Sequence, residues 1–318
     1  MKKMRIFHQK TIWITFGVVV FFVVLGIGAF IQWVRYFTPE RQTIVIVADP
    51  FLIVSFNSRK QQFTVAKIPG DTRIDAVHGY GKYPLASLWK LDRIDKRGGT
   101  LFIKSLEESL SLPIDGYIDP FGQAIPQVVT SDSLSFIRRS FSLWVPFQLL
   151  YQKRTNVPFF SLIAFAVNVA STRFDAFVTY DADRLLTLYD ETLPDGSVVR
   201  SLDAERFRVL LANSFEYTTL RIERLKVGIY NTTATPLLGQ RISQTLEQLG
   251  MFVIFIANDE PVTTTCEVVA RPEYKKSQTV QLLLHLYDCL FVSSTALDSR
   301  DDVSLRIGNA YESLFVPY

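Results

Sequence analysis

Cysteine is scarce in this sequence, with Cys266 and Cys289 the only two among 318 residues. Two thiols are too few for a disulfide framework or for a structural zinc site, which usually takes four ligands. A single bridge between them is compatible with an oxidising compartment. The sequence favours two buried free thiols, because unpaired cysteine packs as a small apolar side chain.

The chain also lacks an excess of charge of either sign. It has 34 Lys and Arg residues against 31 Asp and Glu residues, a formal net charge of +3. Domains that bind nucleic acid usually carry a strongly basic face. We therefore expect no nucleic-acid partner.

Familiar catalytic patterns are missing as well. No HExxH, Walker or GxSxG motif occurs, so the sequence contains no signature of a zinc protease, a P-loop nucleotidase or an α/β-hydrolase. The loop 231–235 precedes an expected helix but has no glycine, whereas dinucleotide-binding loops need glycines where the backbone approaches the ligand. That loop can still receive an anion at the helix N-terminus.

One long apolar run is present near the N-terminus. Residues 12–31 contain no charged side chain and match the ~20 residues that cross a bilayer as a helix. A cleaved signal peptide is the alternative, but its apolar core would be shorter and would end in small residues. This run ends in Phe30-Ile31-Gln32-Trp33, which favours an uncleaved signal-anchor over residues 12–34.

Basic residues predict the orientation of this anchor. Lys2, Lys3, Arg5 and Lys10 precede it, and only Arg35 and Arg41 follow closely. Because positive residues favour the cytoplasmic side, we expect residues 1–11 in the cytoplasm and everything after the anchor outside the cell membrane.

Two strands are expected after the anchor. Residues 51–56 and 63–68 are rich in β-branched and aromatic residues, and a polar hairpin loop separates them. They deliver the loop 69–73 to one edge of a sheet. Its Pro-Gly pair suits a β-turn, so a purely structural turn is one interpretation of this loop and an anion-binding site is the other.

Four short motifs occur in the order in which the LytR-CpsA-Psr family of envelope proteins carries them. They are a strand with an Asn-containing turn, a Pro-Arg-Asp-Thr loop, a Gly-Thr pair that opens a helix, and an Ile-Pro-Ile-Asp-Tyr segment after that helix, and this chain matches them in part. In this chain they are Ile53–Asn57, Lys67–Thr72, Gly98–Thr100 and Leu112–Tyr117. The chain therefore resembles this family.

The resemblance implies an α/β fold, a mixed sheet with flanking helices, and a polyprenyl-(pyro)phosphate-linked glycopolymer as ligand. It also implies a phosphotransferase that moves this polymer to the cell wall. Asp49 and Asp71 would then be the catalytic residues and hold Mg²⁺, while Arg73, Arg93 and Arg97 would bind the pyrophosphate. The alternatives are that Asp49 only forms a turn and that the arginines lie on a solvated basic loop.

The chain departs from the family at two places. Gly70 stands where the family has arginine, and the acidic, arginine-bearing segment between the first strands is shortened to Ala48-Asp49-Pro50. These departures favour a diverged protein that binds its ligand with weak or no turnover. An active transferase and a non-enzymatic envelope scaffold or lipid-binding protein remain alternatives.

The middle of the chain, residues 131–173, predicts aromatic-rich helices. Residues 157–170 are strongly apolar but too short to span a bilayer, so a core helix is favoured over a re-entrant segment. In the family such helices enclose an apolar slot for a polyprenyl tail, and core packing is the alternative role. After the strand 174–180 we expect a helix over residues 184–189.

From Leu225 the sequence changes to short strands alternating with helices. Strands are expected at 225–230 and 251–256 with a helix over 236–249 between them, which implies a parallel pair. The segments Val227–Asn231 and Asp302–Gly308 resemble the LytR C-terminal domain. The predicted division is therefore an LCP-like domain at 42–221 and a small α/β domain at 222–318.

Overall fold

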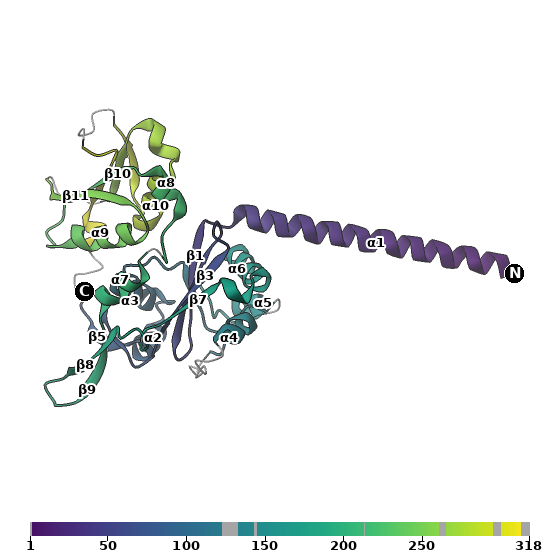
Figure 1. Ribbon diagram of the computed structural model, residues 1–318, viewed down its shortest axis with the longest axis horizontal. Helices are drawn as coiled ribbons and strands as arrows, with labels where there is room; N and C mark the ends of the chain where they lie inside the picture. The colour runs from purple at the N-terminus through teal and green to yellow at the C-terminus, as the bar shows by residue number, and fades with distance from the viewer. Residues whose placement is uncertain are drawn as a thin grey trace.

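The computed structural model describes residues 2–122, 133–142, 145–212, 214–260, 265–294 and 300–312. Its first element, α1 (Lys2–Phe37), is a single helix that projects from the folded body (Figure 1). The segment Phe16–Tyr36 is long and apolar enough to cross a membrane. It overlaps the expected anchor, so α1 is a candidate transmembrane span.

The body begins with a five-stranded sheet in the order β6-β1-β2-β3-β7. Its strands are β1 (Arg41–Ile46), β2 (Phe51–Asn57), β3 (Gln62–Ile68), β6 (Gly116–Ile118) and β7 (Phe177–Asp181). β2 runs antiparallel to β1 and β3, whereas β6 and β7 add to the two edges in parallel. The predicted hairpin and the mixed sheet are both confirmed.

Both faces of this sheet are covered by helices. Every residue of β2 is buried, and successive side chains point to opposite faces. Phe51 and Ile53 enter a core with α2 (Leu85–Ile94) and α3 (Thr100–Leu110). Leu52 and Val54 enter a second core on the opposite face. The helices of that core are α4 (Ser133–Ser140), α5 (Val145–Tyr151) and α6 (Phe159–Ser171).

A buried carboxylate fixes the connection between α2 and α3. Asp92 accepts hydrogen bonds from the backbone N–H of Gly99 at 2.6 Å and of Phe102 at 2.9 Å. The N-cap of α3 is Gly99 and not the expected Thr100. Gly99 has a φ of 90° and the Tyr117 ring lies against it, so a side chain is excluded there.

We expect Asp92→Ala to lower the free energy of unfolding by about 2 to 3 kcal/mol, because two buried N–H groups lose their acceptor. Chemical denaturation measures this loss. Asp92→Asn should recover part of it, since the amide keeps one acceptor oxygen. Asp95→Ala, at the exposed end of α2, is the control, and an equal loss in that variant would contradict the assignment.

A second, four-stranded sheet adjoins the first, with the order β5-β4-β9-β8. It comprises β4 (Arg73–Ala76), β5 (Gly81–Pro84), β8 (Leu188–Thr192) and β9 (Val198–Leu202), and α7 (Ala204–Leu211) follows. The prediction of a helix over residues 184–189 is wrong. Residues 182–186 form turns, and β8 begins at Leu188 because it pairs with β9.

The last part of the chain forms a third sheet in the order β11-β10-β14-β12-β13. Its strands are β10 (Lys226–Asn231), β11 (Phe252–Asn258), β12 (Glu267–Ala270), β13 (Leu290–Ser293) and β14 (Val303–Ile307). The helices around it are α8 (Thr218–Glu223), α9 (Leu238–Gln248), α10 (Gln278–Tyr287) and α11 (Asn309–Glu312). Single turns of 3-10 helix occur at Phe174–Ala176 and Pro272–Lys276. β10 and β11 are parallel, as predicted.

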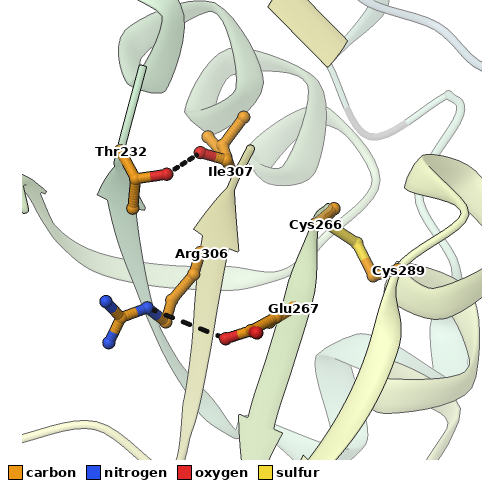
Figure 2. Close-up of a disulfide and its surroundings, with 6 residues drawn as sticks. All are labelled: Thr232, Cys266, Glu267, Cys289, Arg306 and Ile307. Atoms are coloured by element: carbon orange, nitrogen blue, oxygen red, sulfur yellow. Dashed lines mark hydrogen bonds and ion pairs between the residues drawn. A yellow bond between two sulfur atoms is a disulfide. The ribbon is translucent and has the colours of Figure 1, made fainter. Parts of the chain in front are cut away.

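The two cysteines form a disulfide within this third sheet, which corrects the expectation of free thiols. Cys266 and Cys289 immediately precede β12 and β13, and their Cα atoms are 4.4 Å apart. Figure 2 shows the bridge next to an ion pair between Arg306 and Glu267. The mixed α/β fold class is confirmed, while the domain limits at residues 42, 221 and 222 stay predictions.

Candidate functional site

The loop between β3 and β4 is tied to the start of α2. The Gly70 carbonyl accepts from Ala86 N, and the Thr72 carbonyl accepts from Leu85 N, both at 2.9 Å. Thr72 N also donates to the Pro69 carbonyl at 3.1 Å, which closes a turn. The loop thus has the turn geometry that its Pro-Gly pair indicates.

Asp49 is part of the same arrangement. Its Oδ1 atom accepts from the backbone N–H of Gly70 at 2.9 Å. A Cβ atom at Gly70 would lie 3.2 Å from that oxygen and 3.4 Å from the Cβ of Ala86. A side chain at position 70 would therefore crowd Asp49, and the absence of the family's arginine is coupled to the position that Asp49 takes.

The fit of this region to Mg²⁺ is limited. The Oδ1 atom of Asp49 is engaged by Gly70, and Asp71 is exposed on the adjoining loop. Within the described parts of the chain, no group of three or more His, Cys, Asp or Glu side chains could hold a metal ion. Mg²⁺ commonly binds through one or two carboxylates together with substrate phosphates. Asp49 and Asp71 therefore fit a Mg²⁺ that arrives with a diphosphate better than a resident ion.

Arg73, the first residue of β4, opens onto a cleft of about 730 Å³. Its Nη2 atom donates to the Lys82 carbonyl at 2.8 Å. Its Nη1 atom is buried and has no hydrogen-bond partner among the described residues. A buried guanidinium nitrogen without a partner is costly.

Three further cations line this cleft, which we call the basic cleft. They are Lys82 on β5, Arg208 on α7 and Arg241 on α9. The cleft lies where the second sheet meets the C-terminal part of the chain, and Figure 1 shows α9 close to α7. Arg208 joins the two sides, since its Nη1 atom donates to Oε1 of Gln244 at 2.7 Å.

The charges in the basic cleft are partly compensated. Lys82 pairs with Glu191 at 3.1 Å, and the hydrogen bond to that carboxylate raises the pKa of the Lys82 ammonium group. Asp75 and Glu108 also line the cleft. Burial raises the pKa of Glu108. Four cations against these carboxylates make the cleft suited to a phosphate-bearing ligand.

The other two predicted anion-binding arginines contact different groups. Arg93 pairs with Asp119 at 3.0 Å and donates to the Gly122 carbonyl at 2.8 Å. Arg97 donates to the Tyr80 hydroxyl at 2.9 Å. Of the predicted residues, only Arg73 lies among the described residues that line the basic cleft. The roles of Arg93 and Arg97 in anion binding stay predictions.

Sequence reasoning missed Arg208 and Arg241. Each is an ordinary polar residue on an amphipathic helix, more than a hundred positions from Arg73. No local pattern marks either one. Arg208 and Arg241 reach the basic cleft because α7 and α9 pack beside the second sheet.

The aromatic residues of the segment 131–173 divide into two groups, because Phe147 and Tyr151 are exposed. Phe141 and Phe165 are buried in the core shared with α4, α5 and α6, with ring centroids 4.9 Å apart. Trp144 lies outside the described residues. Core packing, the alternative interpretation of these aromatics, therefore holds for Phe141 and Phe165.

Comparison with known proteins gives matches only among solved structures. No protein-family model and no curated protein matches the chain. The LytR-CPS2A-psr family protein TagT, with bound octaprenyl pyrophosphate lipid, is 14% identical with a TM-score of 0.36, and covers 54% of this chain and 87% of its own.

Two further structures extend over more of the chain. TagV from B. subtilis is 11% identical with a TM-score of 0.39, and the match covers 67% of this chain and 98% of TagV. A protein described as a transcriptional regulator from Enterococcus faecalis is 12% identical with a TM-score of 0.41, and covers 69% and 90%. All these TM-scores are below 0.5, so they carry no information on the chemistry of this chain. The solved structures to which the chain is similar include LytR-CpsA-Psr proteins, the family that its sequence motifs resemble.

Proposed function

We propose that this chain is a membrane-anchored, extracytoplasmic protein of cell-envelope biogenesis. It binds a polyprenyl-(pyro)phosphate-linked glycopolymer, and its turnover is weak or absent. The observation that carries the proposal is the basic cleft, which Arg73 and three other cationic side chains line together. A phosphate-rich ligand provides the oxygen acceptors that this set of donors requires.

The membrane location rests on α1 and on the distribution of basic residues. An apolar segment of this length crosses a bilayer, and the excess of basic residues before it orients the body to the outside. A disulfide between Cys266 and Cys289 is compatible with that side, because such bonds persist in oxidising compartments.

An active phosphotransferase is the second candidate function. It is favoured by the position of Asp49 beside the loop that carries Asp71. These two carboxylates would hold Mg²⁺ together with the diphosphate. The ion would neutralise charge on the phosphates when bound. Asp49 and Asp71 would position it, and Arg73 would orient the phosphate oxygens.

Binding to the basic cleft can be measured with a polyprenyl pyrophosphate that carries an anionic glycan, using the full chain in nanodiscs. We expect Arg73→Ala combined with Arg208→Ala to weaken binding by roughly 100- to 10,000-fold, because two charged hydrogen bonds to the ligand are lost and each contributes about 1.5 to 3 kcal/mol. Raised salt should reduce the difference in affinity between the parent and the double variant only in part, since salt screens charges less in a partly enclosed site.

The matched control is Arg200→Ala, an exposed arginine on β9 that pairs with Asp183. It removes one positive charge outside the cleft and should leave binding unchanged. Equal affinity of the double variant and the parent would refute binding at the basic cleft. Release of the glycan by the parent, abolished in Asp71→Ala, would identify the transferase instead of the binding protein.

A further inference from the structure

The helix α6 is apolar on both its inner and its outer face. Leu162, Phe165 and Val169 point into the core beneath the first sheet. The outer positions include Phe160, which is 60% exposed, and the exposed Ala170. Ile163 and Val167, half-buried, complete the same outer stripe. An ordinary surface helix presents polar residues there, so the outer face of α6 calls for an apolar neighbour.

This helix lies across the end of α1. At one end of α6, the Phe160 ring contacts Trp33 with centroids 5.4 Å apart. At the other end, Ser171 lines a cleft of about 370 Å³ together with Arg35 of α1. Trp33 and Arg35 are two residues apart on α1 and thus point to nearly opposite sides of it, about 200° apart. α6 therefore runs crosswise to the axis of α1.

The contact with Trp33 sets the depth of α6 relative to the candidate span. The span ends at Tyr36, three residues beyond Trp33, which corresponds to about 4.5 Å along a helix. A bilayer that α1 crosses over this segment therefore reaches to within a few ångströms of Phe160. The outer face of α6 would then be parallel to the membrane surface and at its level.

Aromatic rings and basic side chains extend this surface in the manner of a membrane interface. Phe159 connects Phe160 to Phe147 on α5, with both ring separations 5.5 Å, and Phe147 is exposed. Lys153 and Arg173 are exposed near the two ends of α6. Aromatic rings favour the headgroup region, and basic residues attract anionic lipids.

We propose that the outer face of α6, together with Phe147 on α5, inserts into the outer interface of the bilayer beside α1. The partner is the lipid surface itself. The proposal rests on α1 spanning the membrane, as proposed above. In Figure 1, α4, α5 and α6 lie on the side of the body from which α1 projects, and the C-terminal sheet lies on the other side.

The test is quenching of tryptophan fluorescence by brominated lipids in vesicles of phosphatidylglycerol and phosphatidylcholine that contain the full chain. Phe160→Trp places a reporter on the surface in question by a conservative change at an exposed position. We expect the emission added by this substitution to fall by about half or more with bromine near the headgroup, and by less with bromine deep in the chains. Phe147→Trp should behave in the same way.

The matched control is Phe252→Trp on β11, where the parent phenylalanine is also well exposed. Its added emission should not be quenched. The proposal would be overturned if the emission added by Phe160→Trp and by Phe147→Trp is not quenched. It would also be overturned if the emission added by Phe252→Trp is quenched to the same extent as theirs. Emission of the Phe160→Trp variant that depends on protein concentration and not on lipid would identify a second copy as the partner, which also overturns it.

The parent protein separates this proposal from the one on which it rests. Trp13 and Trp33 belong to α1 and should be quenched by brominated lipid if α1 spans the bilayer. If the tryptophan emission of the parent is quenched but the emission added by Phe160→Trp is not, only the insertion of α6 is refuted. An unquenched parent would refute the membrane anchor as well.

Discussion

Phe63→Ala is expected to lower the free energy of unfolding by about 3 to 5 kcal/mol. Phe63 is fully buried on β3 and stacks on Phe177 with ring centroids 4.7 Å apart. Phe56 and Phe165 lie at 4.6 and 5.5 Å. These neighbours belong to β2, β7 and α6, so a cavity at this point removes contacts from the sheet and from the helix layer together.

Urea denaturation followed by near-ultraviolet circular dichroism measures this loss. Phe252→Ala, which removes a well-exposed ring from β11, is the control and should change the midpoint little. Because the chain has more than one core, its unfolding need not be two-state, so the comparison rests on the transition that reports the first sheet. A loss below about 1 kcal/mol for Phe63→Ala would be inconsistent with the close packing around its ring.

Replacing both cysteines by serine is the second large change, with an expected loss of about 3 kcal/mol in the C-terminal part of the chain. The bridge closes a loop with a sequence separation of 23 residues, and loop closure of this length restricts the unfolded chain by about that amount. Leu290 N also donates to the Cys266 carbonyl at 2.9 Å, so the bridge joins β12 and β13 where they begin to pair.

Thermal unfolding with and without reductant gives the measurement. Reductant should lower the melting temperature of the parent toward that of the Cys266→Ser, Cys289→Ser variant, and should not affect the variant itself. Thiol labelling of the protein isolated from an oxidising compartment is the direct check. Two reactive thiols after denaturation without reductant would show that the bridge is absent.

Elements whose own residues carry the signal could be predicted from the sequence. The strands expected at residues 225–230 and 251–256 are β10 and β11, and α10 begins after its N-cap Ser277, whose side chain accepts from Val280 N. The parallel pair of β10 and β11 followed from the length of the intervening helix. Such features depend on neighbours within one or two turns of chain, so local pattern is sufficient.

The binding loop could be predicted in part. The sequence placed residues 69–73 after a hairpin, and the structure has them there. It did not indicate that Asp49 Oδ1 accepts from Gly70 N. That contact joins residues 21 positions apart in two loops at one edge of the sheet. A side chain at position 70 would crowd this contact, which no local motif indicates.

The amino-acid sequence alone determined the apolar N-terminal segment, the mixed α/β class and the resemblance to LytR-CpsA-Psr proteins, because these follow from composition, periodicity and short motifs. Tertiary structure decided the rest. It brought Arg208 and Arg241 to Arg73, placed Cys266 within bridging distance of Cys289, and laid α6 across the end of α1. These are contacts between segments far apart in the chain, and their existence depends on how whole sheets and helices pack.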